Sequence, residues 1–297
     1  MLRFSFYLLS QTPIFILHMM GTALGYLFYY LDRGHRHTTL RNLARIFPEK
    51  AKSERICIAK ASFVQVGHTL LEIPRVFMRS KEDLLRSVSI EGEDILHQAL
   101  AENKGVFLMA SHYSNWELMG LLPSMLGIAT STIYRPLNQG KLNTFTQQAR
   151  SRFGTTMHSR RKGLRWLFSA LKENQCVIVA LDQHMGAGNG ILAPFLGHIA
   201  STTPLPAPFV HKNNTPMVGM ALERINHGFQ FKLRFWRIPA PHTTEDKAAN
   251  DIAVMTAACA SFEDMIRTQP EQWLWMHRRW RAVETDENMR DIVHGAP

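Results

Sequence analysis

The 297-residue chain has few cysteines and lacks the spaced motifs that mark several common kinds of active site. Its three cysteines, Cys57, Cys176 and Cys259, are far apart, which argues against a disulfide framework and fits a reducing compartment. No H-E-x-x-H or C-x-x-C pattern occurs, so we expect no structural or catalytic metal. The G-x-S-x-G motif is missing too, which leaves a serine hydrolase with little support.

A glycine-rich stretch is present, but it lacks the spacing of a dinucleotide-binding motif. Gly186, Gly188 and Gly190 do not form G-x-G-x-x-G, and a segment containing proline follows them instead of a clean helix. We therefore expect a loop over residues 184–197 and no bound dinucleotide.

Acidic residues are also few: 24 Asp and Glu stand against 34 Lys and Arg, which gives a formal net charge of +10. This balance predicts an acidic partner, which is a nucleic acid, an anionic membrane surface or an acidic substrate. The hydrophobic fraction of 45% is that of a globular protein, and the length suits one domain.

The N-terminal region predicts attachment to a membrane. Residues 6–31 contain no charged side chain, and about twenty apolar residues suffice to cross a bilayer. No A-x-A-like site for signal-peptide cleavage is found. Arg33, Arg36, Arg41 and Arg45 follow, which places the remainder in the cytoplasm by the positive-inside rule. We expect residues 1–31 to form an anchor helix at the inner membrane, single-pass or monotopic, and residues 32–297 to form one cytoplasmic-facing domain.

The remainder alternates apolar strand-like runs with helical segments, which predicts an α/β fold. We expect a central, mostly parallel or mixed sheet flanked by helices. Predicted strands cover residues 88–90, 106–110, 131–134, 176–181, 216–222 and 229–236. Residues 246–268 are predicted to form one helix.

Polar side chains follow three of these predicted strands. They are His112, Arg135 and Asp182. Ligands of such sheets bind outside the carboxyl ends of the strands, so the three positions predict a site at one edge. Taken singly, Arg135 also fits a surface arginine before a turn, and Asp182 fits a loop cap.

The segment from His112 to Glu117 has two interpretations that do not exclude each other. A histidine at a strand end and a carboxylate in the next helical turn can form a pair that deprotonates a hydroxyl. Ser114 and Glu117 also fit a capping box, with Ser114 as N-cap and Glu117 at the third helical position. A capping position would keep Glu117 ionised beside the helix N-terminus.

Taken together, these blocks resemble the bacterial lipid A biosynthesis acyltransferases, which belong to the wider glycerolipid acyltransferase superfamily. That superfamily is marked by a histidine and an acidic residue separated by four positions. The resemblance covers nearly the whole chain, and it is carried by the apolar N-terminal helix and by Asn42-Leu43-x-x-Ile46-Phe47-Pro48, Glu72, Ser111-His112-Tyr113-Ser114-Asn115-Trp116-Glu117, Tyr134-Arg135-Pro136, Asp182-Gln183, Phe195-Leu196-Gly197 and Pro270 to Trp280.

The resemblance implies transfer of a fatty acyl group from acyl carrier protein, as co-substrate and without another cofactor, to a hydroxyl of a lipid A precursor. His112 would be the general base, and Glu117 would orient it and balance its charge. Arg135 would bind a phosphate or stabilise the oxyanion, and Asn115, Asp182 and Gln183 would contact substrate. The alternative acceptor is a phosphatidylinositol mannoside, on which related acyltransferases act.

Two basic clusters fit acyl carrier protein or an anionic leaflet. One is Arg160-Arg161-Lys162-x-x-Arg165, and the other is Arg278-Arg279-x-Arg281, whose neighbours Trp273, Trp275 and Trp280 predict a membrane-interface position. A nucleic-acid binder and a non-catalytic, membrane-attached lipid-binding protein are the rivals from other classes. No nucleic-acid recognition motif is found, which disfavours the first.

Overall fold

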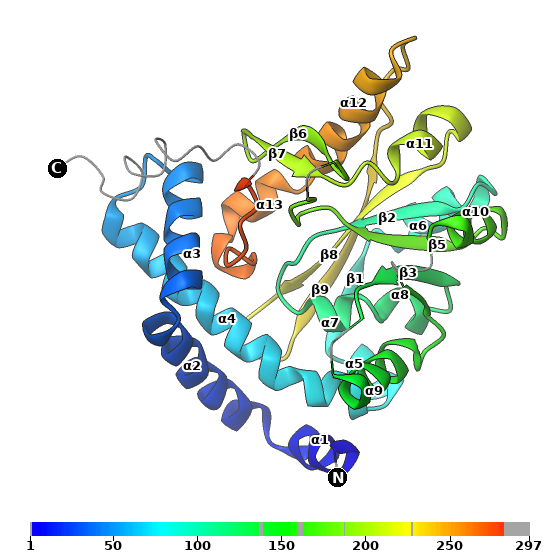
Figure 1. Cartoon of the computed structure of the whole chain (residues 1–297). Coiled ribbons are helices and arrows are strands. Elements are labelled where there is room, and N and C mark those ends of the chain that lie inside the picture. Colours follow the sequence, from blue (N-terminus) through cyan, green and yellow to red (C-terminus); the bar gives the residue numbers. More distant parts are fainter. Residues whose placement is uncertain (1, 137–138, 160–162, 187, 227, 282–297) are drawn as a thin grey trace.

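A seven-stranded, mostly parallel sheet forms the centre of the computed structural model, which describes residues 2–136, 139–159, 163–186, 188–226 and 228–281 (Figure 1). The strand order is β1-β9-β8-β2-β5-β3-β4, and all neighbours are parallel except β8 and β9. The strands are β1 (Val88–Glu91), β2 (Val106–Ala110), β3 (Thr130–Tyr134), β4 (Thr156–Ser159), β5 (Cys176–Ala180), β8 (Met217–Arg224) and β9 (Phe231–Ile238).

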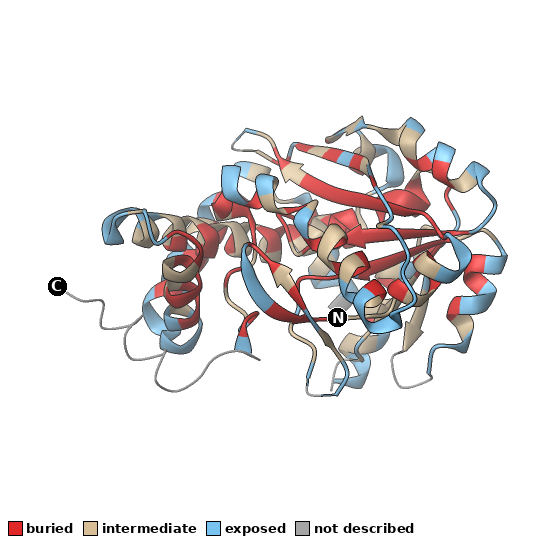
Figure 2. Cartoon of the chain, turned by 90° about the horizontal axis from the view of Figure 1, so that it is seen from above, coloured by how far each residue is buried: buried red, intermediate tan, exposed pale blue. Residues whose placement is uncertain are grey.

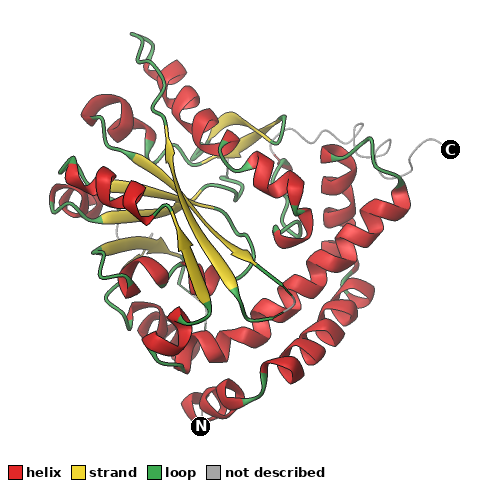
Figure 3. Ribbon diagram, turned by 180° about the vertical axis from the view of Figure 1, so that it is seen from behind, coloured by secondary structure: helices red, strands yellow, loops and turns green. Residues whose placement is uncertain are grey.

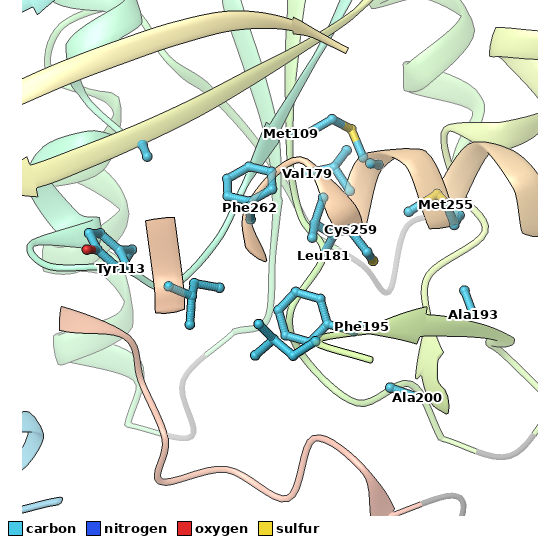
Figure 4. Close-up of a cluster of buried hydrophobic side chains, with 14 of the residues drawn as sticks. Met109, Tyr113, Val179, Leu181, Ala193, Phe195, Ala200, Met255, Cys259 and Phe262 are labelled. Atoms are coloured by element: carbon cyan, nitrogen blue, oxygen red, sulfur yellow. The ribbon is translucent and has the colours of Figure 1, made fainter. Parts of the chain in front are cut away.

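β2 is the central strand of the sheet, and every one of its side chains is apolar and buried. Phe107 and Met109 pack into one hydrophobic cluster, whereas Val106, Leu108 and Ala110 pack into a second cluster on the opposite face. A strand covered on both faces has this continuous apolar sequence. Figure 4 shows Met109 in the first cluster, beside Val179 of β5 and Phe262.

Helices cover both faces of the sheet, as Figures 1 and 3 show from opposite sides. The first cluster includes side chains of α3 (Arg33–Ile46), α4 (Lys52–Met78), α10 (Arg165–Lys172), α11 (Ala207–Asn213), α12 (Lys247–Ala260) and α13 (Glu263–Thr268). The second includes those of α5 (Lys81–Leu85), α6 (Glu93–Ala101), α7 (Trp116–Met119), α8 (Leu122–Met125) and α9 (Gly140–Ser151). Buried residues accordingly run along the strands, and exposed residues lie on the outer surfaces of the helices (Figure 2).

Two segments differ from the sequence-based expectation. The predicted loop 184–197 contains β6 (Ile191–Phe195), which pairs antiparallel with β7 (His198–Thr202). Leu196 and Gly197 both have positive φ, as a two-residue hairpin turn requires, and Ala193 and Phe195 point into the core. The single helix expected over residues 246–268 is two helices, α12 and α13, with Phe262 between them packed on Trp236.

The apolar N-terminal region forms two helices, α1 (Leu2–Gln11) and α2 (Ile14–Leu31). They are separated at Thr12 and Pro13, where Pro13 is the N-cap of the second helix and its ring prevents the first from continuing. α2 and α4 meet the length and composition criteria for crossing a membrane. The N-terminal apolar helix indicates a membrane anchor.

α2 lies along α4 at very short range (Figures 1 and 3). The contact is made through glycines: a methyl group built on Gly67 of α4 would lie 2.1 Å from the backbone oxygen of Gly21 in α2. Only a glycine permits this approach of two helix backbones. α2 is therefore packed against the body of the protein along one side, while its opposite side is exposed.

Candidate active site

Two polar residues that follow neighbouring parallel strands meet at the carboxyl edge of the sheet. β2 and β5 pair in parallel with Ala110 opposite Ala180, so His112 and Asp182 each lie two residues beyond the paired ends. Nδ1 of the imidazole lies 2.8 Å from Oδ1 of the carboxylate. The structure thus joins two of the three strand-end residues that the sequence singles out.

The Asp182 carboxylate is wholly buried and surrounded by donors. Its Oδ2 accepts hydrogen bonds from Ser111 Oγ at 2.8 Å, the backbone N–H of His112 at 2.6 Å and Trp273 Nε1 at 2.9 Å. Burial alone would raise the pKa of Asp182, but the charge and hydrogen bonds of His112, together with the charge of His277, hold that pKa well below its ordinary value of 3.8. Asp182 is therefore a fixed anion behind the imidazole.

The geometry of His112 is that of a general base. Nδ1–H donates to Asp182, and Nε2 faces outward, where it accepts from Gln183 Nε2 at 3.2 Å. The side chain is 20% exposed. Burial favours the neutral ring, but the charge and hydrogen bond of Asp182 outweigh it, so the pKa of His112 is raised above its ordinary value of 6.5. A carboxylate at Nδ1 fixes the tautomer that leaves a lone pair on Nε2.

Glu117 is bound by an arginine and not by the imidazole. Its two carboxylate oxygens form a bidentate pair with Arg150 of α9, in which Arg150 Nε donates to Oε2 at 2.8 Å and a second guanidinium nitrogen donates to Oε1. The charges of Glu117 and Arg150 still act on His112, the first raising and the second lowering its pKa. Asp182 occupies the position beside His112 that the sequence analysis assigns to Glu117.

The capping box expected from Ser114 and Glu117 is wrong. Ser114 has a positive φ of 50°, and the helix begins one residue later, with Asn115 as its N-cap accepting from the Leu118 N–H at 2.9 Å. A left-handed backbone at Ser114 does not suit an N-cap residue, so the cap lies one position later, at Asn115. Asn115 is fully buried and also donates to Glu72 at 2.7 Å, so its side chain is used within the protein rather than presented to a substrate.

The other predicted binding residues lie at the same edge of the sheet but are exposed. Gln183 is the neighbour of His112 described above. Arg135 follows β3, which is adjacent to β5 in the sheet. Both can therefore be reached by a ligand at this edge.

The C-terminal block supports the loop that carries Asp182. Trp273, Trp275 and Trp280 are buried, so the expectation that they lie at a membrane interface is wrong. Arg279 is buried among them and donates to Thr202 Oγ1 at 2.6 Å and to the backbone oxygen of Leu181 at 3.3 Å. Arg279 is buried because it packs against β7, where Thr202 lies. The other two arginines of this cluster, Arg278 and Arg281, are exposed. Most of the other basic cluster, residues 160–162, lies outside the described residues.

Comparison with known proteins assigns the chain to a protein family. The model of the bacterial lipid A biosynthesis acyltransferase family matches residues 3–282. The chain belongs to this family. Family membership makes the protein an acyltransferase of lipid A biosynthesis by class, as the sequence resemblance predicts.

Individual relatives agree over nearly the full length. A lipid A biosynthesis palmitoleoyltransferase of Escherichia coli strain K12 is 25% identical over 283 residues, which cover 94% of this chain and 89% of that protein. A lipid A biosynthesis lauroyltransferase of the same organism is 26% identical over 93% of this chain and 89% of the relative. A phosphatidylinositol mannoside acyltransferase of Mycobacterium tuberculosis is 22% identical over 86% of this chain and 80% of its own length.

The blocks that carry the family resemblance meet in space at Asp182. Ser111 and His112 come from the first block and Trp273 from the last, and all three donate to this one carboxylate. Sequence reasoning missed Arg150, because nothing in its helix distinguishes it from other basic residues. The bidentate pair with Glu117 becomes visible only in three dimensions.

Proposed function

We propose that the protein is an O-acyltransferase that moves a fatty acyl group from acyl carrier protein to a hydroxyl of a lipid A precursor in late acylation. One observation carries the proposal: His112 presents Nε2 outward from a buried Asp182, in a chain of the lipid A acyltransferase family. The acidic carrier protein and the phosphates of the acceptor both suit the net charge of +10.

The mechanism needs a single transfer. The acceptor hydroxyl takes the place of the Gln183 amide at Nε2 of His112 and gives up its proton as its oxygen attacks the thioester carbonyl. Asp182 stabilises the imidazolium. The tetrahedral intermediate then expels the thiolate of the carrier arm, which receives the proton from His112. A second nucleophile is not required, so the proposal includes no acyl-enzyme.

Arg150 and Glu117 have a supporting role in this mechanism. Glu117 is almost wholly buried, and it holds Arg150, whose side chain is 34% exposed, in one orientation. A fixed guanidinium near the base can stabilise the negative charge that develops on the carbonyl oxygen. Glu117 acts on His112 by its charge and by holding Arg150, and not by the direct contact that the sequence analysis expects. Arg135 remains a predicted ligand for a phosphate or for the same oxyanion.

The proposed location is the cytoplasmic side of the inner membrane. The surfaces of α1 and α2 that face away from α4 expose large apolar side chains, among them Phe4, Leu8, Phe15, Met19, Leu27 and Leu31. Lipid is the natural cover for a surface of this kind, and packing of α2 along α4 favours a monotopic arrangement.

Fractionation of cells tests this location. Aspartate substitutions at Phe15 and Met19 should move the protein from the membrane to the soluble fraction, because a charged side chain is costly in lipid. Leu192 is exposed in the β6–β7 hairpin, so Leu192→Asp is the matched control and should stay on the membrane. Equal membrane fractions for all three variants would contradict the assignment.

A phosphatidylinositol mannoside is the alternative acceptor, and the mycobacterial relative supports it. Membranes containing the protein should be offered acyl carrier protein loaded with a fatty acid, together with either acceptor. Transfer to the lipid A precursor supports the proposal, and transfer to the mannoside alone supports the alternative.

His112→Ala tests the catalytic assignment in the same assay. We expect the rate to fall by about 10²–10⁴-fold, the usual contribution of a general base. His97 is an exposed histidine on α6, so His97→Ala is the control and should retain the rate. Near-wild-type transfer by His112→Ala would refute the role of the imidazole.

A further inference from the structure

A large cleft adjoins the His112–Asp182 pair. It has a volume of about 780 Å³ and lies between the beginning of α3, the turn after β5 and the C-terminal block. Gln183 lines this cleft and also contacts Nε2 of His112. A molecule bound in the cleft therefore lies next to the nitrogen that takes the proton.

The walls of the cleft are strongly basic. Arg41 of α3, together with Arg278 and Arg281 of the C-terminal block, lines it from two sides, and His37 and His184 add further N–H groups. Asp32 is the single carboxylate of the lining, and it is hydrogen-bonded to the backbone and ring nitrogens of His35. The cleft therefore carries an excess of positive charge beside the base.

We propose that this cleft binds a phosphate group carried by a substrate of the His112–Asp182 pair. The inference rests on the proposed function, since it assumes that the pair acts on a phosphorylated molecule. Guanidinium groups match phosphate oxygens in geometry as well as in charge, and three of them suit a multiply charged anion. The volume is that of a small-molecule site, about 300–1,000 Å³, so the cleft holds a phosphate together with the group that bears it.

Two substrates can supply this chemistry. Helix α3 follows directly after α2, whose last residues Tyr30 and Leu31 are exposed apolar side chains, so a phosphate on a lipid headgroup can enter from the membrane side. The pantetheine arm of the carrier protein also bears a phosphate, and its thioester must reach His112. Both sources present the same anion to the same arginines.

A binding measurement tests the cleft without any acyl transfer. Inorganic pyrophosphate is titrated into the purified full-length protein in detergent, and its affinity is measured by calorimetry. Arg278→Gln and Arg281→Gln, alone and combined, change exposed side chains, and each should weaken binding by about 10-fold or more, as expected for a lost charge-assisted hydrogen bond. Arg86→Gln, an exposed arginine outside the cleft, should bind as the wild type does.

Kinetics with matched substrates then identify the source. A KM that rises in the double variant for a phosphorylated acceptor, but not for its dephosphorylated form, assigns the acceptor. A KM that rises for acyl carrier protein, but not for an acyl-pantetheine thioester without phosphate, assigns the donor. Either result supports the proposal.

Two outcomes overturn it. One is equal pyrophosphate affinity in the wild type, the double variant and Arg86→Gln. The other is weakened pyrophosphate binding with no change in KM for any phosphorylated substrate. If the wild type binds pyrophosphate in the cleft but transfers no acyl group, the proposed function fails and phosphate binding by the cleft stands.

Discussion

Two carboxylates, Glu72 and Asp182, lie wholly inside the protein, yet different kinds of partner hold them. Glu72 receives both terminal guanidinium nitrogens of Arg224, at 2.7 and 2.8 Å, together with Asn115 Nδ2 and the ring of His18. Among the described residues, His112 is the one titratable side chain that donates to the carboxylate of Asp182, and its other donors are Ser111 Oγ, the His112 backbone N–H and Trp273 Nε1.

The difference separates a structural pair from the pair proposed to act in catalysis. The Arg224 side chain is 3% exposed, and both of its terminal nitrogens donate to the Glu72 carboxylate, so this pair holds two elements of the fold together. This pair connects α4 with β8, and its other partners, His18 and Asn115, belong to α2 and the N-terminus of α7. His112 can gain and lose its proton, and its other nitrogen reaches the surface. A buried carboxylate thus stabilises the fold beside an arginine, and in the proposed mechanism it assists proton transfer beside a part-exposed histidine.

The largest expected effect follows from changing the His112–Asp182 pair. Asp182→Asn should lower kcat for acyl transfer by about 10²–10⁴-fold, because an amide neither fixes the Nδ1–H tautomer nor stabilises the imidazolium. Steady-state transfer measures the loss, and a circular dichroism spectrum confirms that the variant is folded. A folded variant with wild-type kcat would remove the distinction between the two carboxylates.

Changing the structural pair should act on stability. Glu72→Gln leaves the Arg224 guanidinium buried without its counter-charge, which costs about 3–5 kcal/mol in the free energy of unfolding. Denaturant unfolding of the protein in detergent gives this value. Glu93 forms an exposed helix pair with His97, so Glu93→Gln is the matched control and should cost less than about 1 kcal/mol. Equal losses for both variants would mean that Glu72 does not stabilise the fold through Arg224.

The smallest expected effect is a displacement of the pH profile. His112 must be neutral to accept a proton, and its pKa is raised above 6.5, so activity should fall as the pH drops through that raised value. Asp182→Asn removes the charge that opposes the effect of burial, and the low residual activity should then persist to lower pH. Glu72→Gln should leave the profile in place. An unchanged acid limb in Asp182→Asn would show that another group sets it.

The sequence places His112 and Asp182 at one edge of the sheet, but it names Glu117 and not Asp182 as the partner of the histidine. Apolar runs identify β2 and β5 because fully buried parallel strands contain little else, and parallel pairing brings His112 and Asp182 to one edge. The partner of Glu117 is not predictable in this way, because no local sequence pattern relates Glu117 to Arg150 in helix α9. Ser114 satisfies the capping pattern, yet its left-handed backbone moves the cap to Asn115.

The sequence also did not predict that the C-terminal tryptophans and Arg279 are buried. Tryptophans interleaved with arginines are typical of a membrane interface, but Trp273 donates to Asp182 from the interior, and Arg279 satisfies backbone and hydroxyl oxygens there. The sequence did not predict the β6–β7 hairpin, because a glycine-rich segment precedes it and Pro194 lies within β6. Both features are typical of a loop. Tertiary packing decides each of these cases.

The contact between Gly21 and Gly67 also affects how far the proposed site at His112 lies from the lipid that would cover α2. A helix attached by a flexible linker would let the site sample a range of heights above the bilayer, but a helix in backbone contact with α4 moves only with the whole protein. In the proposed membrane arrangement, His112 therefore lies at one fixed depth relative to the membrane surface. Under the proposed transfer, the hydroxyl that is acylated is then the one that stands at this depth from the bilayer.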